Sequence, residues 1–310
     1  MSTDITKKHH YVWRRYLRAW KVNPDDKDIW TGFLQTGEVK KVALMSVAQS
    51  SYFYKFEVLN DEEIAFLQMY MKKLSPNVKS VAEIILNGYI MFGQLKRQLS
   101  SAGIIDNPEI EHELKKIEAG TFETIQSQIE GLGDDLLNCK SIGELESLVQ
   151  KDANEILFYL MVQYLRTKTM KDRLVNSLTE RKMLQSVGHK CWPFFNFVSA
   201  LQIVEIMAKR NDYRFALVNN KSTIPFITGD QPVFNALEDI TDANGDVLGL
   251  ELYYPMSPQT ALKVAFDSGK KYEELDGDEE FVKIGNQLIK KQSQIHIFAN
   301  SEDTLRMMLS

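Results

Sequence analysis

The sequence predicts an α+β fold, in which a helical central region packs against a mostly antiparallel sheet built from an N-terminal hairpin and C-terminal strands. Short patterns rich in β-branched and aromatic residues lie near both ends of the chain. Long stretches with helical periodicity lie between them, which favours segregated helices and strands. We expect one large domain over 1–310, with sub-regions 1–58 (N-terminal motif and hairpin), 59–210 (helical) and 211–310 (sheet-rich).

The N-terminal strands are predicted by a turn signal. Thr36-Gly37 separates two strand patterns over 29–35 and 38–45, and glycine permits the positive φ that a tight turn needs. Further strands with β-branched or aromatic residues follow the helical region. They are expected over 213–218, 225–228, 250–254, 261–266 and 294–299.

The helical region is predicted from apolar residues at the 3.6-residue period. Asn60 is the expected N-cap of its first helix. Glycines 120, 131 and 133 are expected to break helices, whereas 153–178 is expected to form one uninterrupted helix. The remaining helices are expected over 61–74, 78–99, 108–118, 121–137, 195–209 and 278–291.

Composition limits the class of protein. Hydrophobic residues make up 44% of the chain and charged residues 25%, as in ordinary globular proteins. Two cysteines, Cys139 and Cys191, are few for a secreted protein, so both are expected to be reduced. Residues 1–8 lack the apolar run of a secretory signal, and no stretch approaches the roughly 20 apolar residues of a membrane span. We therefore expect a cytoplasmic protein with no membrane partner.

The stretch 7–21 holds six Lys or Arg residues, four aromatic residues and no acidic residue. The net charge of the chain is −5, so this basic stretch is a local feature rather than part of a basic surface. If a helix starts near Trp13, then Trp13, Leu17 and Trp20 share one face that is expected to turn inward. The opposite, basic face would consist of Arg14, Arg18 and Lys21.

Several common chemistries lack their sequence patterns. The chain contains no HExxH or CxxC pattern for a metal, and no GxxxxGK[ST] or GxGxxG loop for a nucleotide. It also contains no GxSxG pattern, so an activated serine is not indicated. We therefore expect neither a metal site nor a cofactor.

Three motifs follow one another along the chain. Residues 10–20 read His-Tyr-Val-Trp-Arg-Arg-Tyr-Leu-Arg-Ala-Trp, residues 163–167 read Gln-Tyr-Leu-Arg-Thr, and residues 226–232 read Phe-Ile-Thr-Gly-Asp-Gln-Pro. They resemble the His-Tyr-Val-Pro-x-x-Tyr-Leu-Arg-x-Phe, Gln-x-x-Arg-Thr and Phe-x-Thr-Ser-Asp-Asn-Pro motifs of an uncharacterised bacterial family, domain of unknown function 4238. Asn286, ahead of the last strand, also fits that family.

The resemblance implies a shared fold and a shared site, but it brings no established reaction. This chain has Trp13 where the family has proline, Gly229 where it has serine, and Gln231 where it has asparagine. Because proline favours the first turn of a helix, His10 is expected just ahead of a helix N-terminus, where an anion is favoured.

The motifs contain polar residues that packing alone would not require. The candidate catalytic residues are His10, Arg166 and Asp230. His10 could act as general base or acid, Asp230 could orient it, and Arg166 could hold an anion in its planar fork. The candidate binding residues are Tyr16, Arg18, Gln163 and Asn286.

This set predicts a metal-independent phosphodiesterase or ribonuclease-like effector of bacterial origin, linked to defence, with RNA or a nucleotide as its ligand. One alternative is a non-catalytic sensor that binds an anionic small molecule or nucleotide. Another is a structural ion-pair network. An enzyme would place His10 and Asp230 in hydrogen-bond contact, a sensor would enclose Arg166 without a positioned base, and a network would pair every charge. The sequence does not indicate an oligomeric state.

Overall fold

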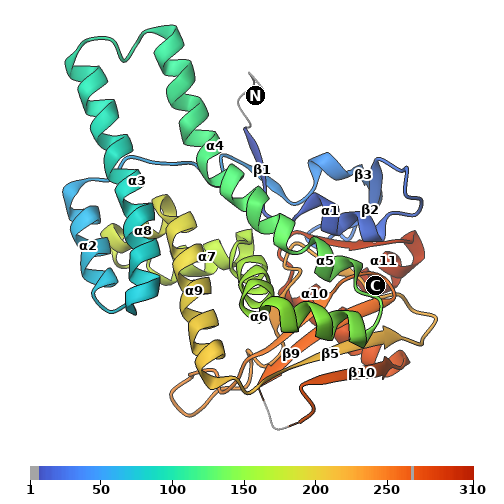
Figure 1. Ribbon diagram of the computed structural model, residues 1–310. Coiled ribbons are helices and arrows are strands. Elements are labelled where there is room, and N and C mark those ends of the chain that lie inside the picture. The colour runs from blue at the N-terminus through green and yellow to red at the C-terminus, as the bar shows by residue number, and fades with distance from the viewer. Residues whose placement is uncertain (1–6, 267–268) are drawn as a thin grey trace.

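The computed structural model describes residues 7–266 and 269–310 and confirms the α+β class. The polar start of the chain lies mostly outside the described residues, since residues 1–6 are not among them. Figure 1 shows most helices of the central region on one side of the molecule and the sheets, with the helices near both ends of the chain, on the other; α6 (Ile142–Leu165) lies between them.

A four-stranded sheet joins the two ends of the chain. The predicted N-terminal hairpin forms β2 and β3, and Gly37 in its turn has φ +69°. The C-terminal strand β11 pairs antiparallel with β2, so that Phe298 lies opposite Thr31. The order is β3 (Val39–Ala43), β2 (Asp28–Phe33), β11 (His296–Ala299) and β6 (Thr228–Gly229).

The other C-terminal strands form a separate five-stranded sheet, whereas the sequence suggested a single sheet. Strand β10 was not predicted, because its sequence Tyr-Glu-Glu-Leu-Asp-Gly is rich in acidic residues that are rare in strands. It pairs in parallel with β5, and the other neighbours are antiparallel. The order is β10 (Tyr272–Gly277), β5 (Tyr213–Asn220), β9 (Thr260–Phe266), β8 (Glu251–Pro255) and β7 (Phe234–Asn235).

The basic N-terminal stretch folds into short elements. On the predicted inward face, Leu17 and Trp20 are fully buried and Trp13 is half-buried; on the predicted basic face, Arg14 and Arg18 are exposed and Lys21 is half-buried. His10 lies at the end of the first strand, four residues ahead of the first helical residue. The elements are β1 (Lys8–His10), α1 (Arg14–Leu17), the 3₁₀ helices η1 (Arg18–Trp20) and η2 (Leu44–Ser46), and β4 (Gln49–Ser51), which pairs with β1.

Two long helices, α3 and α4, form a pair that projects beyond the rest of the molecule (Figure 1). The prediction divided α4 into two helices, yet Gly120 and Gly131 both lie inside it, since one glycine costs a packed helix only about 1 kcal/mol. Gly133 does end it, and a Cβ there would lie 2.3 Å from the ring of Tyr159. The helices of this region are α2 (Asp61–Met71), α3 (Pro76–Ser101), α4 (Pro108–Leu132) and α5 (Asp134–Asn138).

The predicted helix over 153–178 is broken at Arg166 and Thr167. Thr167 has extended backbone (φ −73°, ψ 163°), and its side chain accepts a hydrogen bond from the Met170 N–H as the N-cap of the next helix. Arg166 is therefore the C-cap of α6 rather than a residue inside a helix. The remaining helices are α7 (Lys168–Ser177), α8 (Lys182–Lys190), α9 (Trp192–Arg210), α10 (Glu279–Gln292) and α11 (Glu302–Leu309).

Helix α6 is the centre of the fold. It contacts α9, α4 and the strands β5 and β10, and it is buried from Leu160 to Gln163. The last turn of α6 and Arg166 after it are thus held by packing on several sides.

Over the described ranges, no single helix is both long and apolar enough to cross a bilayer; α8 and α9 reach that length and composition only as a pair bent by 82°.

Candidate functional site

Arg166 is the fixed point of the candidate site. It is 1% exposed, and its Nε donates to the hydroxyl oxygen of Tyr54 at 3.0 Å. Its Nη2 donates to the backbone carbonyl of His10 at 2.7 Å and pairs with Oε1 of Glu130 at 2.8 Å. Its Nη1 is buried and has no hydrogen-bond partner among the described residues. The guanidinium therefore keeps one edge for a further acceptor.

The charge of Arg166 is permanent. Burial lowers its pKa, but the neighbouring Tyr54 and Glu130 outweigh burial and raise the pKa above its ordinary value. The ring of Tyr54 also lies 5.8 Å from the guanidinium carbon, within the range of a cation–π contact. Burial raises the pKa of Tyr54, so this hydroxyl stays neutral. The site thus contains a buried cation at every pH at which the protein folds.

Helix α4 brings two carboxyl groups to this cation and carries a buried amide on the same face. Glu123, Gln126 and Glu130 are three and four residues apart, so they share one face of the helix. The side chain of Glu130 is 14% exposed, and burial raises its pKa although Arg166 opposes the shift. Neither amide atom of Gln126 has a partner within the described part of the chain.

Glu123 has the most unusual carboxyl group in the site. Burial raises its pKa to about 7; Arg166 opposes this shift, and the negative charge of Glu130 adds to it. Its Oε2 atom is buried and forms no hydrogen bond with any described residue. At neutral pH, Glu123 is therefore divided between its protonated and ionised forms.

His10 contributes its backbone and its side chain in different ways. Its carbonyl binds Arg166, whereas its ring nitrogen Nδ1 is buried without a partner among residues 7–266 and 269–310. Burial, together with the charges of Arg14 and Arg166, lowers the pKa of the imidazole to about 4, although a hydrogen bond with the backbone of Val47 opposes the shift. The imidazole is neutral at physiological pH.

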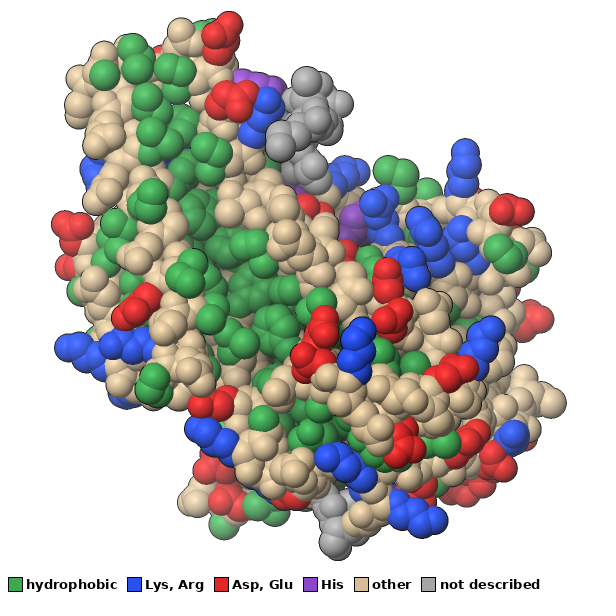
Figure 2. All heavy atoms as spheres, viewed as in Figure 1, with side chains coloured by type: hydrophobic (Ala, Val, Ile, Leu, Met, Phe, Trp, Pro, Cys, Tyr) green, Lys and Arg blue, Asp and Glu red, His purple; other side chains and the backbone are tan. Residues whose placement is uncertain are grey.

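Gln163 and Arg14 complete the site. Gln163 lies one helical turn before Arg166, is 2% exposed, and has an Nε2 group without a partner in the described structure. Arg14 is exposed, and its charge acts on His10, Glu123 and Glu130. Figure 2 shows further Lys and Arg side chains gathered over the region of α1 and β3. We call this set the Arg166 cluster: His10, Arg14, Tyr54, Glu123, Gln126, Glu130, Gln163 and Arg166.

Asp230 has different partners from the one expected. Its Oδ1 accepts the N–H of Gln294 at 2.8 Å, and its Oδ2 accepts those of Ile295 at 2.8 Å and His296 at 3.1 Å. Burial raises its pKa to about 6, and these three bonds oppose the shift. The carboxylate organises the turn between α10 and β11, which is a structural role and differs from the expected role of orienting His10.

The predicted binding residues separate into three groups. Gln163 belongs to the Arg166 cluster, whereas Arg18 is exposed on η1. The Tyr16 hydroxyl donates to the Pro255 carbonyl at 2.7 Å and shares a 2.6 Å bond with the Thr228 hydroxyl.

Asn286 accepts the N–H of Ile227 at 2.9 Å and donates to the carbonyl of Pro225 at 2.9 Å. Asn286 and Tyr16 therefore both hold the segment that leads to Asp230.

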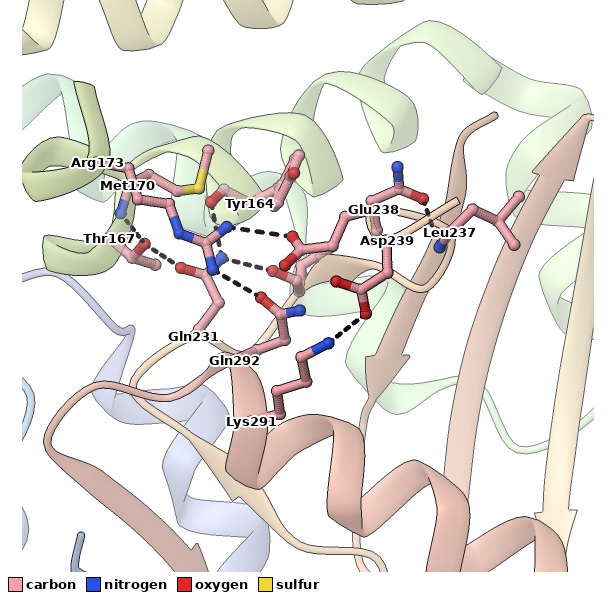
Figure 3. A network of polar contacts seen from close by, with 12 residues as sticks. Tyr164, Thr167, Met170, Arg173, Gln231, Leu237, Glu238, Asp239, Lys291 and Gln292 are labelled. Atoms are coloured by element: carbon pink, nitrogen blue, oxygen red, sulfur yellow. Dashed lines mark hydrogen bonds and ion pairs between the residues drawn. The ribbon is translucent and has the colours of Figure 1, made fainter. Parts of the chain in front are cut away.

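Gln231 joins the second and third sequence motifs. The Thr167 hydroxyl donates to its side-chain oxygen, and its Nε2 donates to the carbonyls of Tyr164 at 2.9 Å and Val233 at 2.6 Å (Figure 3). The motif residues are thus close in space, yet many of them act as supports for the break between α6 and α7. The third motif fixes the backbone on which Arg166 is presented.

Sequence reasoning missed the α4 contribution. Glu123, Gln126 and Glu130 lie among many charged residues of α4, such as Glu109 and Lys115, that face solvent. Their spacing beside the buried Phe122 was the available signal, because it places them next to the buried face of the helix. Within the described residues, no three His, Cys, Asp or Glu side chains are grouped as metal ligands would be. Both cysteines are free and buried.

Comparison with known proteins identifies a family but no function. No curated protein matches the chain. No solved structure matches it either. The model of the family described as "Protein of unknown function (DUF4238)" matches residues 8–191 and 195–303, which is nearly the whole chain. The chain therefore belongs to the DUF4238 family.

Proposed function

We propose that the Arg166 cluster binds a small anionic molecule that carries a phosphate or carboxylate group. The supporting observation is the concentration of buried hydrogen-bond donors without partners on Arg166, Gln126 and Gln163, around a permanent cation. Leaving one such group unpaired costs about 1–3 kcal/mol, so a structure with several of them gains stability when a ligand supplies acceptors. The planar fork of arginine matches both anions in geometry.

A purely structural ion-pair network accounts for less of the site. Arg166 and Glu130 would satisfy one another in such a network, as they do here. However, such a network does not explain why Nη1 of Arg166 and Oε2 of Glu123 are buried without a hydrogen-bond partner among the described residues. Arg14 is exposed and Glu123 is partly exposed, so one side of the cluster lies near the surface of the protein.

The binding of an anion should depend on the protonation of Glu123. Ionised Glu123 repels an incoming anion, whereas protonated Glu123 can donate a hydrogen bond to it. Because the pKa of Glu123 is about 7, affinity is expected to rise as the pH falls from 8 to 6. The imidazole of His10 stays neutral over this range and contributes no change of charge.

The test is calorimetric titration at pH 6 and pH 8 with sulfate, which has the tetrahedral geometry of phosphate, and with benzoate, because neither anion changes its own charge over this range. Wild type should bind at least one of the two, and more tightly at pH 6. Glu123→Gln should bind about equally at both pH values, and Gln163→Leu should bind about tenfold more weakly, as expected when a charge-assisted hydrogen bond is lost.

Arg18→Ala serves as the control. Arg18 carries the same charge as Arg14 and lies on the same N-terminal stretch, but it lies outside the cluster. Its affinity should equal that of wild type. Two results would contradict the proposal: absence of binding by both probes, or a pH dependence that survives in Glu123→Gln.

A second candidate is a metal-independent phosphodiesterase or ribonuclease-like effector. Glu123 favours it, because a carboxyl group with a pKa near 7 can donate a proton at neutral pH. The neutral imidazole of His10, with Nδ1 unpartnered, can accept one. Arg166 would then stabilise the charge on the phosphoryl group.

This candidate is tested by incubating an RNA oligonucleotide with the protein in the presence of EDTA. Wild type should cleave it, whereas His10→Ala and Glu123→Gln should lose about 100-fold or more of the rate, the usual contribution of a general acid or base. The same variants expressed in bacteria should differ from wild type in growth and RNA integrity. Equal behaviour of wild type and His10→Ala would remove the nuclease candidate and leave the binding proposal intact.

A further inference from the structure

A cavity that shares no residue with the Arg166 cluster lies between α9 and one end of the five-stranded sheet. Its volume is about 940 Å³, at the upper end of the range for small-molecule sites. Helix α9 supplies Ile203, Ile206 and Met207 to its lining, and the segment that leads into β8 supplies Leu248 and Leu250. Most of the lining residues are apolar, so an apolar ligand that enters this cavity leaves water.

Large apolar side chains around this cavity remain in contact with water. Ile206 is 58% exposed, Leu248 is 65% exposed, and Val247 is half exposed. Single exposed apolar residues are ordinary, but a group of them around a concave surface marks a binding site. Each Å² of apolar surface that a ligand covers contributes about 25 cal/mol to the burial term. These side chains are accessible before a ligand arrives, so they can contact it directly.

Tyr164, in the last turn of α6, gives the cavity a polar group. It is half-buried, and its hydroxyl makes no hydrogen bond with any described residue. The hydroxyl oxygen is accessible, since it is not among the buried polar atoms that lack a partner. Burial raises the pKa of Tyr164, Glu238 adds to this shift, and Arg173 opposes it. The hydroxyl therefore stays protonated at neutral pH and can donate one hydrogen bond to a molecule in the cavity.

The charged residues of the lining indicate the charge of that molecule. Each of them is paired with a residue of opposite charge: Arg173 with Glu238 at 3.1 Å, Arg210 with Asp212 at 2.7 Å, and Glu251 with Lys263 at 2.9 Å. Figure 3 shows the first of these pairs next to Tyr164. A charged ligand would lose its water and find no unpaired opposite charge among the described lining residues, so the cavity favours a neutral ligand.

We propose that this cavity binds a neutral amphiphile, which is a molecule with an aliphatic chain and one hydroxyl or carbonyl oxygen. The apolar lining consists mainly of Ile, Leu and Val side chains, which favours an aliphatic body over a stacked ring. The chain packs against Ile206 and Leu248 and removes them from water. The oxygen of the ligand accepts the hydrogen bond that the Tyr164 hydroxyl donates. This site goes beyond the proposed anion binding, because it shares neither ligand class nor residues with the Arg166 cluster.

The test is a fluorescence titration with N-phenyl-1-naphthylamine, a neutral probe whose emission rises in apolar surroundings. Wild type is expected to bind the probe, and 1-decanol should displace it. Decanoate has the same chain length with a negative charge, so at pH 8 it should displace the probe about tenfold or more weakly. Tyr164→Phe should keep its affinity for the probe, which has no oxygen, and should bind decanol about threefold to tenfold more weakly.

Ile206→Lys and Ile84→Lys form a matched pair of variants. Both positions are helical and exposed, and Ile84, which is 72% exposed on α3, lies outside the cavity lining. Ile206→Lys places an ammonium group in the apolar wall and should bind the probe about tenfold or more weakly. Ile84→Lys should bind it as wild type does.

Four results would overturn the proposal. They are failure of wild type to bind the probe, failure of decanol to displace it, equal displacement by decanoate, and equal probe affinity in Ile206→Lys and wild type. Light scattering covers the remaining occupant. A wild-type dimer that Ile206→Lys dissociates would show that a second copy of the chain covers the cavity, which also overturns the proposal.

Discussion

The Nη2 atom of Arg166 lies 2.7 Å from the backbone carbonyl oxygen of His10, so the end of α6 holds the first strand through a peptide group and not through the imidazole. This geometry separates two properties of His10. The contact that orders the strand is made by the backbone carbonyl and does not depend on the side chain. Any proton transfer by His10 would instead use the unpartnered Nδ1 atom of the side chain. A substitution at position 10 can therefore test chemistry while the support by Arg166 remains.

The stability of Arg166→Gln should differ sharply from that of His10→Ala. Removing Arg166 leaves Glu130 buried without its cation, which should cost about 3–5 kcal/mol. Without Arg166, the folded-state pKa of Glu130 rises further above its unfolded value, so the variant loses stability as the pH rises and should be more stable at pH 5 than at pH 8. His10→Ala keeps the carbonyl contact and should cost about 1 kcal/mol. Urea unfolding at both pH values measures this, and equal losses for the two variants would contradict it.

Glu123→Gln should change how the free energy of unfolding depends on pH. The folded-state pKa of Glu123 is about 7, above its unfolded value of about 4.3, so the folded protein holds this proton more tightly. The stabilisation is complete below about pH 4 and is lost as the pH rises through 7. Relative to wild type, the variant should gain about 3 kcal/mol between pH 4.5 and pH 8, because two pKa units or more of the shift fall in this window at about 1.4 kcal/mol per unit. Parallel pH profiles of the two proteins would disprove this assignment.

Tyr16→Phe should lower stability, although Tyr16 lies in the most basic stretch of the chain. The substitution removes the hydroxyl bonds to Thr228 and Pro255 and leaves a buried carbonyl without its donor, which should cost about 1–3 kcal/mol. Arg18→Ala, two residues later on the surface, should change stability by less than about 0.5 kcal/mol. Thermal unfolding would show the contrast, and a stable Tyr16→Phe would mean that the hydroxyl contributes nothing to the fold.

Gly229 lies against the side chain of Ser293, which limits the size of the residue at position 229. A Cβ at position 229 would lie 1.9 Å from the hydroxyl oxygen of Ser293 and 3.1 Å from its Cβ. Gly229→Ala should therefore cost about 1–3 kcal/mol through overpacking. Adding Ser293→Gly should recover part of that loss, so a double-mutant cycle should give a clear coupling energy. Additive effects would show that position 293 does not restrict position 229.

The sequence carried enough information for the hairpin and most helices, because turn chemistry and apolar periodicity are local signals. It failed at the break after α6, where helical periodicity continues through Arg166 and only the dihedral angles of Thr167 end the helix. The hydroxyl of Thr167 is held by Gln231, which is 64 residues away in the chain. A contact of this kind depends on the tertiary structure and leaves no local trace.

Prediction of the candidate site from the sequence has the same limit, because contacts between distant residues leave no local pattern. The motifs contained His10 and Arg166, which the structure brings into contact, and Asp230, which it assigns to the backbone of 294–296. Glu123 and Glu130 belong to no motif, and their pKa values follow from burial against Arg166. Acidic residues on a long helix are usually solvated, so only the packing of α4 on α6 distinguishes these two.

The pairing of β2 with β11 also constrains synthesis of the protein. A nascent chain that has left the ribosome as far as β10 contains the hairpin of β2 and β3, but one edge of β2 still has unpaired backbone groups. That edge is closed only after residues 296–299 have been translated and have reached it. Chains that stop before this point expose an edge able to pair with other molecules, which makes translation of β11 a requirement for a monodisperse product.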